Sequence, residues 1–341
     1  MRIAAILHPY SSDSILERFR APGVNLFRGN ILERNDLPDA ALVFGGDGSV
    51  HRLLNALAYS GCPVLVVPTG SGNDFAFALG IKSVADSLSA WRRFLDKRDN
   101  VRTIDLGVLT EPGGRSANGA LRGEDWKPAV STITFAGDEG RIAPPSTELA
   151  PHIMRNELRH AIRLDEQTSS RIYFGSVAGV GLDAATNEFA SRMPPWLRGS
   201  AGYAVAALRA LASHKGHAVS VRAEGPEGPF SVSAPALIAA FGNSPYFGNG
   251  MRILPKALLD DGLLDVCFVH NVSKLRVIRE FPKLYSGSHV KLDAVEYTQA
   301  ASIVIESAVP LPVCADGERV ATTPVEANVA RGALQVIVPG E

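Results

Sequence analysis

Short apolar segments alternate with helix-like patterns along the first hundred residues. The apolar segments have the length of buried strands and are residues 3–7, 41–44, 63–67 and 101–104. Helical patterns lie between them at residues 49–58, 75–79 and 83–95. Ser83 can cap the last of these helices, because Asp86 follows three residues later. Strands that alternate with helices predict an α/β domain with a mostly parallel sheet.

The pattern changes after Gly107. Residues 109–170 are polar and broken by glycine and proline, and they predict only a strand at 131–135 and a short helix at 154–163. Further apolar runs predict strands at 172–178, 218–223, 236–241, 263–269, 302–305 and 334–338. A helix is expected at 196–213, with one face made by Leu197, Ala201, Ala204, Leu208 and Leu211. We therefore predict a second, β-rich domain that forms a sandwich.

Composition limits the possible functions. The 341 residues correspond to about two domains, and 34 basic residues against 35 acidic ones give a net charge of −1. This balance provides no general attraction for nucleic acid. The three cysteines, Cys62, Cys267 and Cys314, are far apart and indicate neither a disulfide framework nor a zinc site, so we expect a cytoplasmic protein. The uncharged stretch at 231–251 contains prolines and several glycines and is not a transmembrane segment.

Two glycine-rich turns carry the strongest chemical signal. An apolar run leads into residues 45–49 (Gly-Gly-Asp-Gly-Ser), and another leads into residues 68–74 (Pro-Thr-Gly-Ser-Gly-Asn-Asp). Each turn precedes a predicted helix. Glycine lets backbone N–H groups approach phosphate oxygens, and a helix N-terminus adds partial positive charge. The pair of turns therefore predicts a phosphate-binding edge, although either turn alone is more often only a tight connection.

Three acids accompany these turns. Asp47 and Asp74 lie within them, and Asp105 comes at the end of the next predicted strand. Carboxylates beside a phosphate cradle would repel a nucleotide unless a divalent metal lies between them. The three acids therefore predict a metal-dependent nucleotide site.

Five motifs occur in order and resemble the catalytic domain of the diacylglycerol kinase family, which includes sphingosine kinases and bacterial lipid kinases. The motifs are residues 45–49, 68–76, 246–251 (Tyr-Phe-Gly-Asn-Gly-Met), 259–265 (Leu-Asp-Asp-Gly-Leu-Leu-Asp) and 316–318 (Asp-Gly-Glu). The resemblance implies the two-domain fold shared by NAD kinases and diacylglycerol kinases, with an α/β nucleotide-binding domain and a β-sandwich domain. We place the ATP-binding domain at 1–108 and the lipid-substrate domain at 109–324, with an unusual insertion at about 109–170. The tail, 325–341, is a candidate to pack back onto the first domain.

The resemblance also implies ATP and Mg²⁺ as cofactors and assigns the site residues. Asp316 would be the catalytic base, and Asp47, Asp74 and Asp105 would form a network around Mg²⁺. The nucleotide would contact Pro9, Gly45, Gly46, Gly48, Ser49, Gly70, Ser71, Gly72, Asn73 and Glu318. A structural Mg²⁺ site would use Asp261 with the backbone of Leu258 and Leu263. The Asp-Gly pairs at 316–317 and 261–262 are also favoured turn residues, so both positions have a plausible structural role.

Some positions depart from the family pattern. His8 precedes Pro9 where the family usually has asparagine, and Phe77 stands where arginine is common. Ser49 and Ser71 replace threonine and keep a hydroxyl group. The other histidines lack ligand spacing, and we expect them at the surface or satisfied in the core.

The lead hypothesis is transfer of the γ-phosphoryl group of ATP to a lipid hydroxyl, with diacylglycerol as the first candidate. Two alternatives remain open, a kinase for a soluble acceptor such as NAD and a nucleotide-responsive lipid-binding protein without turnover. The lipid substrate would be met at the inner face of the membrane. Met193, Pro194, Pro195, Trp196 and Leu197, flanked by Arg192 and Arg198, suit such a surface, although Trp196 could equally anchor a helix in the core. No pattern indicates an oligomeric state.

Overall fold

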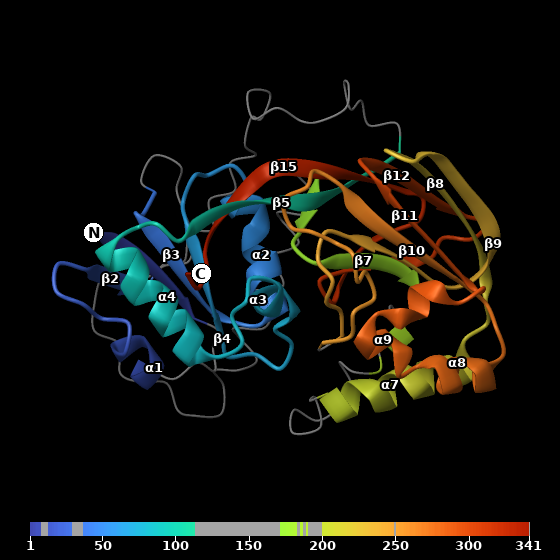
Figure 1. Cartoon of the computed structure of the whole chain (residues 1–341), viewed down its shortest axis with the longest axis horizontal. Coiled ribbons are helices and arrows are strands. Elements are labelled where there is room, and N and C mark those ends of the chain that lie inside the picture. The colour runs from blue at the N-terminus through green and yellow to red at the C-terminus, as the bar shows by residue number, and fades with distance from the viewer. Residues whose placement is uncertain are drawn as a thin grey trace, which may run out of the picture.

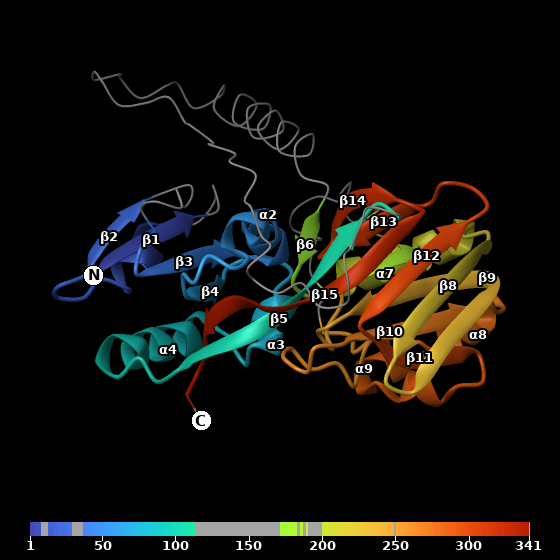
Figure 2. The same ribbon diagram turned by 90° about the horizontal axis from the view of Figure 1, so that it is seen from above.

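The computed structural model describes residues 1–7, 13–28, 37–112, 171–182, 185, 186, 189, 200–248 and 250–340. Two lobes lie side by side, and the strands β5 and β15 run between them (Figures 1 and 2). Several predictions fall outside the described residues: the strand at 131–135, the helix at 154–163, the apolar tip at 193–197, and the positions of His8 and Pro9.

The first lobe is an α/β unit, as the alternating pattern predicts. Its parallel strands follow the order β4-β3-β1-β2 and are Arg2–Leu7 (β1), Asn25–Arg28 (β2), Ala40–Gly45 (β3) and Val64–Pro68 (β4). Its helices are Asp13–Glu17 (α1), Asp47–Leu57 (α2), Asp74–Ala78 (α3) and Val84–Asp96 (α4). The predicted cap of α4 is present, because the Ser83 hydroxyl accepts a hydrogen bond from the backbone N–H of Asp86.

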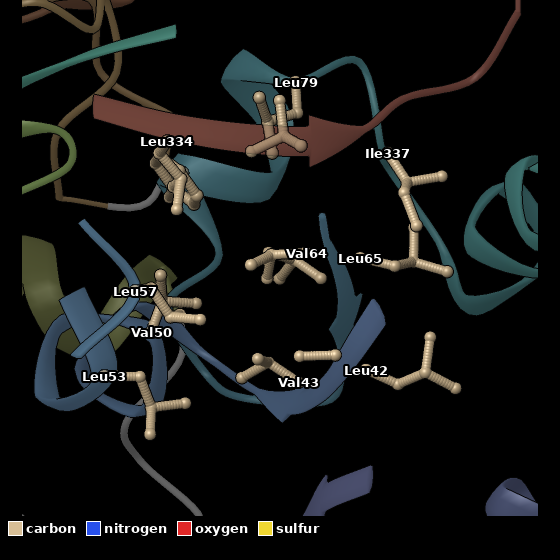
Figure 3. Close-up of a cluster of buried hydrophobic side chains, with 14 of the residues drawn as sticks. Leu42, Val43, Val50, Leu53, Leu57, Val64, Leu65, Leu79, Leu334 and Ile337 are labelled. Carbon is tan, nitrogen blue, oxygen red and sulfur yellow. The ribbon is translucent and has the colours of Figure 1, made fainter. Parts of the chain in front are cut away.

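The core of this lobe is built from both ends of the chain. Val43 of β3 and Val64 of β4 point toward the apolar side chains of α2, whereas Leu42 and Leu65 point to the other face of the sheet (Figure 3). Leu334 and Ile337 of β15 join the same cluster (Figure 3).

β15, Val325–Ile337, links the two lobes. Its first residues pair with β12 of the second lobe, and Val336 pairs in parallel with Val64 of β4. β5, Val101–Thr110, runs antiparallel beside it. The expectation that this strand ends before Asp105 and joins the parallel sheet was wrong: Asp105 lies in its middle, and β5 pairs only with β15 and β6 among the described strands. Pairing with a strand 220 residues away in sequence overrides the local pattern.

The second lobe is the β-rich unit that the sequence predicts. Its strands are Ile172–Phe174 (β6), Val177–Gly181 (β7), His217–Gly225 (β8), Gly228–Gly242 (β9), Leu264–His270 (β10), Val295–Ala300 (β11), Ser302–Ser307 (β12), Pro312–Ala315 (β13) and Glu318–Thr322 (β14). Hydrogen bonds connect them in the order β14-β13-β7-β9-β8-β12-β15, with β10 and β11 extending from β9. The single strand predicted at 172–178 is in fact two, because the chain bends at Gly175 and Ser176.

Helices cover one side of the second lobe (Figure 1). They are Ser200–Ser213 (α7), Lys274–Glu280 (α8) and Lys283–Ser286 (α9), followed by a 3₁₀ turn at Ser288–Lys291. Two residues of the predicted α7 face differ in exposure: Leu211 is buried together with Ala207 and Ala210, whereas Leu208 is exposed. Within the described part of the chain, no helix is long and apolar enough to cross a membrane. The exact domain boundaries stay a prediction.

Candidate active site between the lobes

The two glycine-rich turns pack against each other, backbone to backbone. The N–H of Asp47 donates to the carbonyl of Gly72 (3.0 Å), and that of Thr69 donates to the carbonyl of Gly45 (3.1 Å). A Cβ atom on Gly46 would lie 2.3 Å from the Gly72 oxygen, and one on Gly70 would lie 2.5 Å from the Gly46 Cα. Only glycine permits this approach at either position.

Part of the phosphate cradle expected from the sequence is already used by the protein. Besides the N–H of Asp47, that of Ser49 donates internally, to the carbonyl of Gly46 (2.9 Å). In the described part of the chain, the N–H groups of Gly70, Ser71 and Gly72 donate no hydrogen bond. The Thr69 hydroxyl and the Asn73 side-chain oxygen are likewise buried without a partner there. Such groups are costly unless a ligand or water satisfies them, so the second turn fits a polar ligand better than the first.

Asp47 holds the two turns and a helix together. Its carboxylate accepts hydrogen bonds from the backbone N–H groups of Asp74 and Phe75 (both 3.0 Å) and thereby caps α3. Burial, followed by the nearby charge of Asp74 and then that of Asp316, raises the pKa of Asp47 to about 7, although the two hydrogen bonds act in the opposite direction. Three predicted acids are therefore close enough to influence one another.

Asp74 connects the first lobe with the second. It is buried, and its carboxylate accepts a hydrogen bond from the backbone N–H of Gly250 (2.8 Å). Gly250 belongs to the motif at residues 246–251, in which Phe247 and Met251 form a short antiparallel bridge. The motif at 246–251 therefore reaches the glycine-rich turns directly.

Asp316 lies in a tight turn that faces α2. Its backbone has φ +49°, and Gly317 follows with φ +84°, so the predicted Asp-Gly turn is present. Its carboxylate accepts hydrogen bonds from the backbone N–H groups of Gly175 and Ser176 (both 2.8 Å) and contacts Nδ1 of His51 (2.9 Å). The bend between β6 and β7 thus supplies the two donors that hold this acid.

The sequence interpretation missed His51. Its Nδ1 pairs with Asp316, while its Nε2 has no hydrogen-bond partner in the described part of the protein. One signal was available: His51 follows Asp47 by four residues, which places both on one face of α2. Asp316, the residue that His51 contacts in the folded chain, lies 265 residues away in sequence, and no local pattern marks the pair.

Glu318 lies against the first turns of α2. A Cβ atom on Gly48 would come within 2.9 Å of its Oε1, and Arg52 lies 3.5 Å from the same oxygen. Residues 316–318 therefore face the helix that begins at the first glycine-rich turn, as the assignment of Glu318 to the nucleotide site requires.

Asp105 lies in different surroundings. Its carboxylate accepts hydrogen bonds from the backbone N–H groups of Gly262 and Gly332 (both 2.7 Å), and its own N–H donates to the Leu259 carbonyl (2.7 Å). The pKa of Asp261 is raised mainly by burial, and the nearby charge of Asp105 raises it further. The structure therefore groups Asp105 with the 259–263 turn and does not show it acting on Asp47.

The 259–263 turn has the expected polar character. The Asp261 carboxylate accepts a hydrogen bond from the N–H of Leu263 (3.0 Å) within its own turn. Asp260 pairs instead with Arg102 of β5 (2.8 Å), and the Leu258 side chain is exposed. Within the described residues, no group of three or more histidine, cysteine or acidic side chains could hold a metal ion directly.

An apolar cavity of about 120 Å³ lies in the second lobe, between the sheet and the helices. The residues that line it include Leu237 and Ile238 of β9, Val269 of β10, Val277 of α8, Leu284 of α9, and Phe247 and Met251. Phe247 and Met251 flank Gly250, whose N–H donates to Asp74. One short segment therefore contacts both the buried acids and the cavity.

Two family models match the chain. The diacylglycerol kinase catalytic domain matches residues 25–109, and the YegS C-terminal NAD kinase beta sandwich-like domain matches residues 175–338. Both segments of the chain are similar to the diacylglycerol kinase family of lipid kinases. The recognition from five motifs is thereby confirmed, and with it the two-domain fold.

Relatives within this family span most of the chain. A diacylglycerol kinase of Mycobacterium tuberculosis (strain ATCC 25618 / H37Rv) is 29% identical over 307 residues, which cover 88% of this chain and 77% of that protein. A YegS-like lipid kinase of Chromohalobacter salexigens is 29% identical over 299 residues, 86% of this chain and 74% of its own length. Its similarity to these kinases identifies the chain as a phosphotransferase with an alcohol acceptor.

A solved diacylglycerol kinase structure from Bacillus anthracis str. Sterne has the same fold. Its TM-score is 0.61 at 16% identity, and the match covers 99% of this chain and 96% of that one. At this identity the match supports the architecture of the family and says nothing of the substrate.

Proposed function

We propose that the chain transfers the γ-phosphoryl group of ATP to the hydroxyl group of a lipid, with diacylglycerol as the acceptor and phosphatidic acid as the product. The observation that carries the proposal is the position of the 246–251 segment. Gly250 donates to the buried acid Asp74, while Phe247 and Met251 line the apolar cavity. An apolar tail held in the cavity would present its polar end toward the acids and the glycine-rich turns.

The second glycine-rich turn supports ATP as the phosphoryl donor. Its unused N–H groups and the unpartnered oxygens of Thr69 and Asn73 suit the polar atoms of a nucleotide. In this proposal the nucleotide contacts Gly45, Gly46, Gly48, Ser49, Gly70, Ser71, Gly72, Asn73 and Glu318, and Pro9 remains a predicted contact.

The acids support Mg²⁺, bound through few protein ligands. Mg²⁺ in kinases usually keeps several waters and uses one or two carboxylates together with substrate phosphates. Asp47 and Asp74 fit this description, since a cation would offset the proximity that raises the pKa of Asp47. When bound, the ion would neutralise charge on the transferring phosphoryl group. The place of Asp105 in this network and the structural site at Leu258, Asp261 and Leu263 stay predictions.

Asp316 is the proposed base for the acceptor hydroxyl. Two backbone N–H groups fix its carboxylate, and His51 contacts one of its oxygens. These contacts hold the carboxylate in a defined orientation, as a group that accepts a proton during transfer requires. His51 is then a positioning residue for Asp316.

A phosphorylation assay with radiolabelled ATP tests the function. The acceptors are diacylglycerol, ceramide, sphingosine, monoacylglycerol and phosphatidylglycerol in mixed micelles, with NAD in buffer as the alternative. We expect label in the product of diacylglycerol and none in that of NAD. Labelling of NAD alone would replace the lipid proposal, and binding of ATP and lipid without transfer would favour a non-catalytic lipid-binding protein.

A further inference from the structure

Exposed apolar side chains are concentrated on the helices of the second lobe. The described residues contain seven large apolar side chains that are exposed, and five of them belong to α7, α8 and α9. Leu275 is 78% exposed, Ile278 is 51% exposed and Tyr285 is 46% exposed, while Val205 and Leu208 extend the set onto α7. We call Leu275, Ile278 and Tyr285, with the basic residues of α8 and α9, the α8–α9 face.

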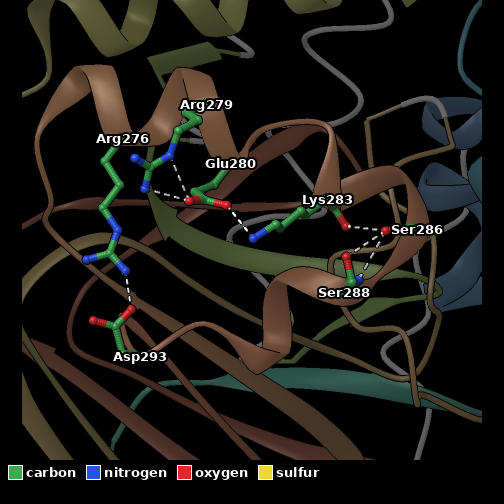
Figure 4. Close-up of polar contacts among 7 residues, drawn as sticks. All are labelled: Arg276, Arg279, Glu280, Lys283, Ser286, Ser288 and Asp293. Carbon is green, nitrogen blue, oxygen red and sulfur yellow. Dashed lines mark hydrogen bonds and ion pairs between the residues drawn. The ribbon is translucent and has the colours of Figure 1, made fainter.

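The α8–α9 face is positively charged in a chain that is nearly neutral overall. Residues 274–286 contain four basic side chains and one acidic side chain, a net charge of +3, compared with −1 for all 341 residues. The acidic Glu280 lies between Arg279 and Lys283 and pairs with both (Figure 4). Its side chain is 15% exposed and that of Arg279 is 72% exposed, so the outward charge is positive.

The remaining basic groups are only partly neutralised. Arg276 pairs with the exposed Asp293, and Lys274 donates to the carbonyl of Ala212 at the end of α7, which ties α7 to α8. Among the residues that the structure describes, no acidic side chain pairs with Lys274.

The same two helices form part of the wall of the apolar cavity, and Arg276 and Glu280 are among its lining residues. Val277, Phe281 and Leu284 line the cavity from one side of the α8–α9 segment. Leu275, Ile278 and Tyr285 do not line it and are exposed. α8 and α9 contain no buried residue, so they form a single thin layer over the cavity.

We propose that the α8–α9 face docks on a bilayer that contains anionic lipid, and that the lipid acceptor enters the cavity beside these helices. This inference rests on the proposed lipid-kinase function. Short helices with apolar side chains among basic ones lie in the interface of a membrane, where the apolar groups enter the acyl boundary and the basic groups meet anionic headgroups. The cavity beneath then receives an acyl chain without its transfer through water.

Vesicle binding in the absence of ATP tests the docking alone. The full chain is sedimented with vesicles of phosphatidylcholine and with vesicles of phosphatidylcholine and phosphatidylglycerol in equal amounts. We expect binding to the anionic vesicles that weakens as salt is added. The double variant Leu275→Ser/Ile278→Ser should lower this affinity by roughly 10- to 100-fold, because two apolar side chains no longer leave water.

A second variant and two controls keep the result interpretable. Arg279→Gln should weaken binding only to anionic vesicles, and it changes an exposed side chain that cannot disturb the core. The matched controls are Val309→Ser, at a side chain that is 48% exposed outside these helices, and Arg222→Gln, on the strand β8. Unchanged binding in both test variants, or equal loss in the controls, would overturn the proposal.

Activity assays separate this inference from the proposed function. With diacylglycerol in detergent micelles, Leu275→Ser/Ile278→Ser should retain wild-type turnover, whereas turnover on vesicles should fall. Vesicle binding by a wild-type protein that phosphorylates no lipid would refute the kinase proposal and leave the docking surface in place. A dimer that dissociates in the double variant, with vesicle binding unchanged, would show that the α8–α9 face holds a second copy instead.

Discussion

Asp47 and Asp105 are alike in the sequence and different in the structure. Both follow or interrupt an apolar run in the first 110 residues, and each carboxylate accepts hydrogen bonds from two backbone N–H groups. The donors to Asp105 come from the 259–263 turn and from the middle of β15, so this acid fastens three distant segments together. Asp47 also fastens a helix, but it does so beside Asp74 and Asp316, and burial together with these negative charges raises its pKa to about 7. The two acids therefore differ in their acidic neighbours, Asp74 and Asp316 for Asp47 and Asp261 for Asp105, and not in their hydrogen bonds.

The largest expected effect is at Asp316. Asp316→Asn should lower kcat by about 10²–10⁴-fold, the usual contribution of a general base. ATP affinity should change little, since the nucleotide is assigned to the glycine-rich turns. Asparagine tolerates the positive φ of this turn. However, its amide nitrogen would replace the oxygen that accepts from Gly175 or Ser176, so the free energy of unfolding should fall by about 1–3 kcal/mol while the protein stays folded. Near-normal turnover would remove Asp316 as the base and direct attention to Asp47.

Separate substitutions of Asp47 and Asp105 test the comparison directly. Asp47→Asn and Asp74→Asn should each abolish most activity in a folded protein, with the loss most evident at limiting Mg²⁺. Asp105→Ala should instead lower the free energy of unfolding by about 2–6 kcal/mol, because the N–H groups of Gly262 and Gly332 lose their acceptor. Urea denaturation and turnover on the same preparations separate the two effects. If Asp105→Asn is fully stable but inactive, Asp105 belongs to the metal network after all.

The raised pKa of Asp47 predicts a dependence on pH. A carboxyl group with pKa about 7 in the folded state and 3.8 in the unfolded state binds its proton more tightly when folded. Its contribution therefore lowers the stability of the metal-free protein as pH rises from about 4 to about 7, by roughly 1 kcal/mol per pH unit. Asp47→Asn should remove this slope in denaturation curves recorded at several pH values. Identical slopes in the two proteins would show that Asp47 is already ionised at low pH.

The smallest effect is expected at His51. His51→Ala should lower kcat by about 10-fold and leave KM for ATP unchanged, because Asp316 keeps both backbone donors when its side-chain contact is lost. His51→Asn, which can still donate a hydrogen bond, should recover part of the rate. A purely structural histidine would instead lower the melting temperature in both variants without this difference in turnover.

Local patterns predicted the parts of the fold that are local. The parallel strands, the capped helix α4 and the two glycine-rich turns each depend on residues close together in the chain, and all are present. The wrong expectation involves pairing across a long distance, because β5 pairs with β15 and does not join the parallel sheet. The cavity and the contact between His51 and Asp316 could not be predicted from local patterns, because residues from elements far apart in the chain create them.

β15 has a consequence for the order in which the molecule is assembled. Leu334, Val336 and Ile337 complete the core and the sheet of the first lobe, yet they follow the entire second lobe in the chain. During synthesis the first lobe therefore emerges early and waits, with the edge of β4 unpaired, until the later residues arrive. The first lobe can reach its final form only after the second lobe has been made, so a chain interrupted on the way lacks part of the first lobe's core and sheet.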